Sequence, residues 1–240
     1  MSLATKTSAR TKILASALAV IRAKGYAATS LDDLCTAAGV TKGAFFHHFK
    51  SKEDLAVAAA DFWSETTGAL FASAPYHAPA DPLQRVLGYI DFRKAILVGG
   101  IPEFTCLAGT MVQETYETNP AIRDACARAI VAHAETTEAD VAAAMQQRGM
   151  SPGWSAKSLA LHMQAVLQGA FILAKAKGGA QVAAESVDHL RRYVELLFKQ
   201  DLHQEDARRR YVLGRPLRHL HRSVRARLVD RHPQEGHDGR

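Results

Sequence analysis

Residues 25–55 read GYAATSLDDLCTAAGVTKGAFFHHFKSKEDL, and this stretch decides the predicted fold. Ser30 followed by Asp33 is a capping box, which predicts that a short helix begins there. Gly39 is expected to end that helix, because glycine adopts the positive φ that a tight reversal between helices requires. A third short helix is expected from about Thr41 to His48. The segment therefore predicts a helix-turn-helix.

The sequence on both sides of this segment predicts further helices. Residues 7–24 carry apolar side chains at positions i, i+4 and i+8, as in an amphipathic helix. Ser51 and Asp54 form a second capping box, which predicts a longer helix that runs towards Ala72. Beyond a loop at 73–80, cap, proline and glycine signals predict helices over 81–98, 104–117, 119–149, 155–177 and 181–200, with Gly99, Gly100 and Pro102 as breakers.

Composition favours the same fold class. The chain has 240 residues, 48% of them hydrophobic, so it is long enough to bury a real core. Residues that favour helix are abundant, whereas the alternating apolar stretches typical of strands are missing. We therefore expect an all-α protein of about nine helices. Its expected parts are a three-helix helix-turn-helix domain over 1–55, a helical domain over 56–202 and a basic tail over 203–240.

Positive charge is concentrated at the two ends of the chain. The net charge is +6, and residues 1–60 hold eight Lys or Arg against four Asp or Glu. Residues 203–240 hold ten Arg against five Asp or Glu, and the middle of the chain is slightly acidic. Two basic ends favour a polyanionic partner, most simply a nucleic acid.

Several protein classes are not expected. No apolar run looks long enough to span a bilayer, and the N-terminus lacks the apolar core of a signal peptide, which favours a cytoplasmic protein. Cys35, Cys106 and Cys126 show no paired spacing, so free thiols are expected. His133 and His162 lack metal-ligand spacing, and neither an HExxH motif nor a Gly-rich phosphate loop occurs. We expect no enzyme, no metal site and no cofactor.

The helix expected from Thr41 to His48 has the properties of a DNA-recognition helix. It begins with small and basic residues, which let a backbone approach a groove and let an ammonium group meet a phosphate. Phe45 and Phe49 lie four residues apart and are expected to anchor the helix in the core. Its two histidines then face elsewhere. On a short basic helix after a turn, this favours DNA contact over a plain surface role.

The quoted stretch resembles the DNA-binding signature of the TetR family of repressors, and the match extends over about residues 7–60. The resemblance implies a protein that binds a double-stranded DNA operator. It implies that Ser30 and Lys52 contact phosphates and that His47 contacts DNA. The family usually has a tyrosine where this chain has Phe46, whose ring lacks the hydroxyl that bonds a phosphate. The full set of expected DNA-binding residues is Ser30, Thr41, Lys42, Gly43, Ala44, Phe46, His47, His48 and Lys52.

The resemblance also assigns a role to the rest of the chain. Members of the family bind a small molecule among the central helices and a partner subunit through the last two helices. Here the helix at 155–177 is apolar around much of its circumference, which favours a homodimer interface on one side; packing wholly inside the core is the alternative. We expect a repressor that an unknown small molecule or electrophile releases from a palindromic operator. No charged residue marks the pocket, and its apolar candidates, each of which also suits plain core, are Phe71, Tyr89, Phe92, Met111, Met145 and Phe171.

Cys106 is a candidate sensor residue. Cys106, Thr110 and Gln113 share one face of their predicted helix, and Lys175 lies near the end of the helix at 155–177. This arrangement is similar to the electrophile- and oxidant-sensing NemR-like branch of the family, in which a cysteine and a lysine at matching places form the sensor. A nearby cation stabilises a thiolate and so raises its reactivity. The alternative is a small packed cysteine and a lysine favoured by the helix dipole.

The C-terminal tail has a pattern of its own. Arg215-Pro216 is typical of a helix start, and Leu213, Leu217, Leu220, Val224 and Leu228 recur at near-helical spacing among arginines. The pattern fits an extra basic helix that adds phosphate contacts or meets an anionic surface; a solvated extension is the alternative. A non-specific nucleic-acid-binding or membrane-surface protein would explain these arginines, but it would not explain the helix-turn-helix.

Overall fold

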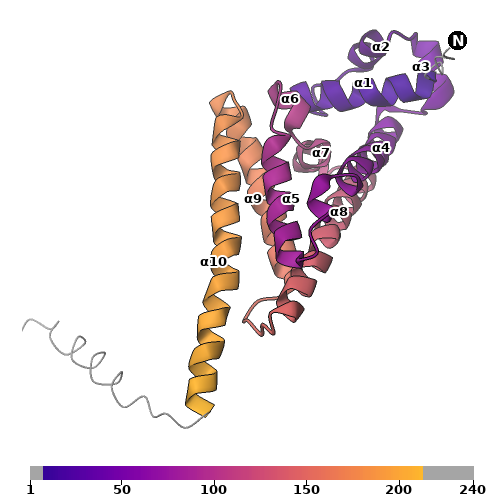
Figure 1. Ribbon diagram of the computed structural model, residues 1–240. Coiled ribbons are helices and arrows are strands. Elements are labelled where there is room, and N and C mark those ends of the chain that lie inside the picture. The colour runs from indigo at the N-terminus through magenta and orange to yellow at the C-terminus, as the bar shows by residue number, and fades with distance from the viewer. Residues whose placement is uncertain (1–7, 213–240) are drawn as a thin grey trace, which may run out of the picture.

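The computed structural model describes the backbone of residues 8–212 and the side chains as far as residue 199. This part of the chain is all-helical, which confirms the predicted fold class. One end of the molecule holds α1 to α3, α4 leads away from them, and α10 lies on the opposite side (Figure 1). The helices are α1 (Ala9–Lys24), α2 (Leu31–Ala38), α3 (Lys42–His48), α4 (Lys52–Ala72), α5 (Pro82–Ala95), α6 (Ile101–Phe104), α7 (Leu107–Thr115), α8 (Pro120–Gln147), α9 (Ala156–Lys177) and α10 (Gln181–Val212), with a short 3-10 helix at Pro75–His77.

The helix-turn-helix forms where the local signals place it. The Ser30 hydroxyl accepts the Asp33 N–H and the Asp33 carboxylate accepts the Ser30 N–H, which is the predicted capping box of α2. Gly39 follows α2 with a φ of 64°, a left-handed conformation that favours glycine. Thr41 then caps α3 by accepting the Ala44 N–H. These local bonds set α3 at an angle to α2.

The predicted capping box at the start of α4 is only half formed. The Ser51 side chain accepts the Asp54 N–H, as expected. The Asp54 carboxylate, however, accepts the N–H of Lys50 at 2.9 Å instead of the N–H of Ser51. The Asp54 carboxylate thus bonds the backbone N–H of the residue before the helix cap instead of the N–H of the cap itself.

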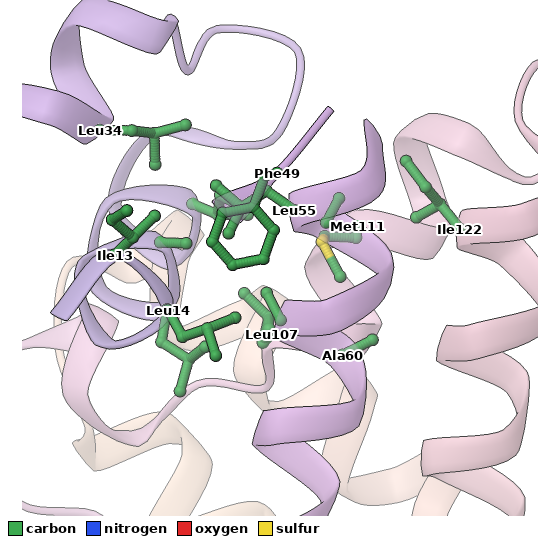
Figure 2. Close-up of a cluster of buried hydrophobic side chains, with 14 of the residues drawn as sticks. Ile13, Leu14, Leu34, Phe49, Leu55, Ala60, Leu107, Met111 and Ile122 are labelled. Atoms are coloured by element: carbon green, nitrogen blue, oxygen red, sulfur yellow. The ribbon is translucent and has the colours of Figure 1, made fainter. Parts of the chain in front are cut away.

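One apolar core joins α1, α2 and α3 to the central helices (Figure 2). Phe45 and Phe49 are buried, as predicted, and they pack with Leu34 of α2. Leu107 and Met111 of α7 belong to the same core and are fully buried. The predicted domain boundary between residues 55 and 56 lies inside α4, which contributes apolar residues to this core on both sides. A shift of α7 is therefore felt by the helix-turn-helix, because close-packed interiors transmit strain.

A second core lies among the helices farther along the chain. It joins α5, α8, α9 and α10 around Tyr89, Val141, Met163, Leu167 and Val194. The predicted linker at 73–80 contributes to it as well, because its 3-10 helix buries Tyr76. The last helix extends twelve residues beyond the predicted end at residue 200 and runs past its neighbours (Figure 1).

The region between α5 and α8 differs from prediction. Helix α5 ends at Ala95, before the predicted end at residue 98, and the helix expected over 104–117 is α7, which begins only at Leu107. The short helix α6 occupies the place of the predicted break, because Pro102 lies in its first turn, where no backbone N–H is needed. Capping sets the start of α7: the Sγ of Cys106 accepts the Gly109 N–H at 3.3 Å.

The prediction that no apolar run could span a bilayer was wrong for α9. Within residues 8–212, this helix alone is long and apolar enough to cross a membrane by length and composition. In the structure it packs against α8 and α10, and its buried residues include Leu159, Met163 and Leu167. Its hydrophobicity therefore serves the protein core on one face. The extra helix predicted after Gly214 lies outside the described residues.

Candidate functional site

One face of α3 is exposed and makes few contacts within the protein. Thr41, Lys42, Gly43, Phe46 and His47 are all exposed, whereas Ala44 and His48 are half-buried. The Phe46 ring is 52% exposed and touches only the edge of the Phe45 ring among the described aromatic contacts. Phe46 is thus a large apolar side chain that α3 leaves open to solvent.

Gly43 has no internal reason to be glycine. Its backbone is helical, and a Cβ built on it would meet only the Thr41 hydroxyl, at an ordinary 3.8 Å. Glycine inside a helix costs about 0.5–1 kcal/mol relative to alanine. Nothing within the described protein therefore needs the space that this glycine leaves open.

Lys42 is held by an exposed ion pair. Its Nζ lies 2.7 Å from a carboxylate oxygen of Asp32 on α2, and this bond raises the pKa of Lys42. The two side chains are 59% and 72% exposed, so solvent and salt screen the pair and it contributes little to stability. Lys42 can therefore exchange Asp32 for a phosphate at small cost.

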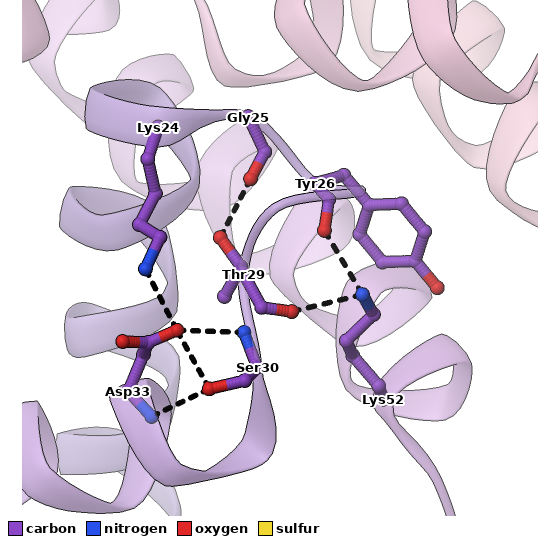
Figure 3. Close-up of polar contacts among 7 residues, drawn as sticks. All are labelled: Lys24, Gly25, Tyr26, Thr29, Ser30, Asp33 and Lys52. Atoms are coloured by element: carbon purple, nitrogen blue, oxygen red, sulfur yellow. Dashed lines mark hydrogen bonds and ion pairs between the residues drawn. The ribbon is translucent and has the colours of Figure 1, made fainter.

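Two of the expected phosphate contacts already have partners inside the protein (Figure 3). The Ser30 hydroxyl donates to Asp33 at 2.7 Å, and Asp33 also pairs with Lys24 at 2.8 Å, which lowers the pKa of Asp33. The Lys52 ammonium donates to the carbonyls of Tyr26 and Thr29 at 3.0 and 2.9 Å. Lys52 therefore holds the loop before α2, and only its remaining N–H is available to a phosphate.

A cavity of about 320 Å³ lies among the central helices α4 to α9, and one residue of α1, Arg22, reaches it. Aromatic and aliphatic side chains provide most of its wall, which suits a small organic molecule. Its lining comes from helices α1, α4, α5, α6, α7, α8 and α9. The lining residues are Arg22, Trp63, Thr66, Thr67, Leu70, Phe71, Arg93, Ile96, Leu97, Glu103, Phe104, Cys106, Ala108, Ala129, Ile130, His133, Gln164, Gln168 and Phe171.

Only some of the expected pocket residues line this cavity. Phe71 and Phe171 line the cavity, as does Cys106. Tyr89 and Phe92 do not line it but pack around Phe71, with ring centroids 5.8 and 5.5 Å from it. Met111 and Met145 lie elsewhere, in the first and the second core.

Charged residues line this cavity, contrary to the expectation that no charge marks the pocket. Arg22 reaches it from α1, where its guanidinium donates to the carbonyls of Leu18 and Glu103 and lies over the Trp63 ring. Arg93 reaches it from α5. Sequence reasoning missed both, because helices far apart in the chain bring them together and no local pattern records it.

A hydrogen-bonded chain of uncharged groups crosses the cavity wall. Gln164 donates to the Tyr89 hydroxyl at 3.0 Å, and that hydroxyl lies 3.0 Å from Nε2 of His133. The Arg93 guanidinium is also within 3.5 Å of this nitrogen. Burial, assisted by the charge of Arg93, lowers the pKa of His133 to about 3. His133 is therefore neutral at neutral pH.

The candidate sensor residues come together. The Lys175 ammonium donates to the Thr110 hydroxyl at 2.9 Å, and both line a small pocket with Cys106 and Gln113. Cys106 also lines the large cavity, so it borders both the pocket that Lys175 lines and the cavity that Arg22 lines. Cys35 and Cys126 are buried, and burial raises the pKa of Cys126 to about 12. No disulfide occurs among the described cysteines, and the described residues contain no group of three or more His, Cys, Asp or Glu side chains that could hold a metal ion.

The outer faces of α9 and α10 form an exposed apolar surface. Leu173 of α9 and Leu196 of α10 are 46% and 54% exposed. His162 and Tyr193 join the two helices, with ring centroids 5.2 Å apart. We call this surface the α9/α10 patch; its exposed apolar members are Leu161, Ile172, Leu173, Tyr193 and Leu196.

Known protein families match both parts of the chain. The profile described as bacterial regulatory proteins of the tetR family matches residues 13–59. The profile described as the C-terminal domain of LmrA/YxaF-like transcriptional regulators matches residues 82–183. The regulator AcrR of Shigella flexneri is 38% identical over 74 residues, which is 31% of this chain and 34% of AcrR. In the curated relatives that it matches, the chain spans between 16% and 34% of their length.

Solved structures share the fold over about three quarters of this chain. A TetR transcriptional regulator from Chloroflexus aurantiacus has a TM-score of 0.67 and 27% identity, over 78% of this chain and 94% of that one. The reduced form of E. coli NemR has a TM-score of 0.66 and 18% identity, over 77% of this chain and 95% of that one. The likeness to NemR concerns the fold and leaves the NemR-like sensor a prediction.

Proposed function

The chain belongs to the TetR family of bacterial regulatory proteins, and from this premise we propose that it is a dimeric, ligand-responsive repressor of transcription. Proteins of this family regulate transcription by binding DNA and are not enzymes, which agrees with the expectation from sequence. The proposal places the protein in the cytoplasm, where bacterial DNA lies. It includes a sequence-specific operator, a partner subunit and a small-molecule effector.

The exposed face of α3 is the observation that carries the proposal. Its open Gly43, its exchangeable Lys42 and its uncovered Phe46 and His47 have the composition of a helix that enters a major groove. The Phe46 ring lacks the hydroxyl expected at this place, but it can pack against a thymine methyl group. Ser30 and Lys52 support this face mainly by holding the loop and the start of α2.

Lys42→Ala is expected to weaken binding to all DNA sequences and to reduce the slope of log affinity against log salt by about one unit, because one ammonium–phosphate pair is removed. Fluorescence anisotropy with a labelled duplex at several salt concentrations measures the slope. Lys94→Ala is the matched control, since Lys94 also forms an exposed ion pair, with Asp188, but lies on α5. An unchanged slope for Lys42→Ala would remove Lys42 from the phosphate contacts.

The α9/α10 patch supports dimerisation. An exposed apolar face on two long adjacent helices is stabilised when a second copy covers it, and a twofold axis would then build a four-helix interface. The same axis relates two α3 helices, which would read half-sites about one helical turn of DNA apart. The expected operator is therefore palindromic.

The cavity supports a response to a ligand. Arg22 belongs to α1, yet its guanidinium lines the cavity and is bonded to the Glu103 carbonyl of α6. A second link runs from α7, where the Glu114 carboxylate accepts the N–H groups of Tyr26 and Ala27 at 3.3 and 2.7 Å. A ligand that moves Arg22 or α7 would thus move the helix-turn-helix.

Covalent sensing at Cys106 is the second candidate for the effector response. Of the three cysteines, Cys106 alone is not buried, and it borders two pockets, each of which an arginine or a lysine also lines. An electrophile such as N-ethylmaleimide would form a bond from its alkene carbon to this sulfur, and the neighbouring carbon would take up a proton.

Treatment with one equivalent of N-ethylmaleimide is expected to label Cys106 and to release bound DNA, whereas Cys106→Ser should keep its DNA. Peptide mass mapping locates the label, and anisotropy follows the release. Cys126→Ala is the control, because a buried thiol of high pKa should not compete. Equal release from Cys106→Ser would leave Cys106 as a packing residue and the effector as a non-covalent ligand.

A further inference from the structure

Arg93 is a cation without a counter-charge on the wall of the large cavity. Helix α5 carries three cations on this part of the protein. Two of them are neutralised: Arg85 pairs with Asp140 at 2.7 Å, and Lys94 pairs with Asp188 at 2.7 Å. Among the side chains that the structure describes, no carboxylate lies within ion-pair distance of Arg93. A half-buried guanidinium of this kind favours a negative partner from outside the protein.

The surroundings of Arg93 hold its guanidinium in place without neutralising it. The group lies over the rings of Phe71 and Phe171, 5.2 and 5.6 Å from their centroids. Its only described hydrogen-bond partner is Nε2 of the neutral His133, at the long distance of 3.5 Å. A guanidinium offers five N–H donors, so most of them remain available.

The second cation of the cavity strengthens this bias. Arg22 donates to two backbone carbonyls, which carry no net charge, and no described carboxylate forms an ion pair with it. Glu103 is the one acidic residue of the lining; its carboxylate accepts the Gly100 N–H at the start of α6, and its charge also acts on Arg22. The charged lining of the cavity remains net positive, with two arginines against one carboxylate, and the rest of the wall is largely apolar.

We infer that the effector is an organic acid anion, whose carboxylate binds Arg93 and whose apolar body fills the cavity beside Phe71 and Phe171. This inference rests on the proposed function, in that the cavity is taken to be the effector site. A neutral molecule of the same shape would gain the same apolar contacts but would leave the guanidinium unpaired. A bidentate, charge-assisted hydrogen bond between the guanidinium and the carboxylate is expected to favour the carboxylate by about 10- to 100-fold in affinity.

Matched pairs of a carboxylate and its amide test the inference by isothermal titration calorimetry on the full chain. The probes are 2-naphthoate with 2-naphthamide, and decanoate with decanamide. We expect at least one carboxylate to bind about 10- to 100-fold more tightly than its amide. In Arg93→Gln this preference should disappear while the affinity of the amide stays the same.

Two further variants keep the test sharp. Lys94→Gln removes one positive charge from the same helix outside the cavity and should keep the full preference. Arg93→Lys keeps the positive charge but loses the planar guanidinium that binds a carboxylate through two N–H groups, and it should keep part of the preference. No preference for a carboxylate in either pair, including no binding of any of the four probes, would overturn the inference. A preference that survives in a folded Arg93→Gln would overturn the role of Arg93.

Failure of this inference is distinguishable from failure of the proposed function. DNA binding is measured on the protein without any ligand. A protein that binds DNA specifically but shows no carboxylate preference remains a repressor with an uncharged effector. A protein that binds carboxylates but no DNA would contradict the proposed function, while the inferred carboxylate site would stand.

Discussion

Gly43→Leu is expected to lower the affinity for operator DNA by about 100-fold or more while the protein stays folded. An operator would lie against α3 where the Gly43 Cα is exposed, so a leucine there would hold the helix away from the base edges. Each well-aligned pair of hydrogen bonds to a base that is broken in this way is worth about 1–3 kcal/mol. The fold should tolerate the change, because a Cβ at this position meets nothing closer than 3.8 Å. Thermal unfolding should show an unchanged or slightly raised Tm, since glycine is a poor helix former.

Gly68→Leu is the matched control for this variant. Gly68 is also an exposed glycine within a helix, and a Cβ built on it meets nothing within 4 Å, but it lies in α4, away from α3. It should bind operator DNA as the wild type does. If Gly43→Leu binds with wild-type affinity, α3 does not enter the groove and the proposed interface is wrong.

Leu173→Glu is expected to convert the dimer into monomers and to lower operator affinity by about 100-fold or more. A carboxylate placed in a buried apolar interface has no partner and strongly disfavours association. In the dimer, binding of the first half-site holds the second subunit at a high effective concentration near the second half-site, which is worth about 10²–10⁴ in affinity. A monomer loses this gain. Analytical ultracentrifugation measures the first effect, and anisotropy with a two-site duplex measures the second.

Val131→Glu provides the comparison for the interface. Val131 is an exposed apolar residue as well, 39% exposed, but it lies on α8 and outside the α9/α10 patch. This variant should remain a dimer. A Leu173→Glu protein that sediments as a dimer would place the interface elsewhere on the surface.

Local signals explain why the helix-turn-helix was predictable from sequence. Ser30, Gly39 and Thr41 act through bonds to residues within five positions of themselves, so the pattern in the chain is the pattern in space. Phe45 and Phe49 were predictable for the same reason, because helical spacing decides which side is buried. The half-formed capping box at Ser51 shows the limit of such local prediction. Whether the Asp54 carboxylate accepts the N–H of Ser51 or that of Lys50 depends on the loop geometry.

Long-range packing explains what the sequence did not reveal. Arg22 and Arg93 are separated by more than 70 residues, and only the packing of α1 against α6 and α7, and of α5 against α8, brings them to one cavity. Met111 is helical and apolar like a pocket residue, yet it faces the first core. The constellation of Cys106, Thr110 and Lys175 was predictable only through the resemblance to a family, and the structure brings these residues together without testing their chemistry.

Selection of bound duplexes from a random library of DNA tests the central claim most directly. The protein is incubated with the library at physiological salt, and the retained sequences are read over several rounds. A repressor with two α3 helices should enrich a palindrome whose half-sites lie about one helical turn apart, bound at least about 10³-fold more tightly than unselected DNA. Retention without any enriched motif would show that the protein binds DNA through charge alone and would contradict the account.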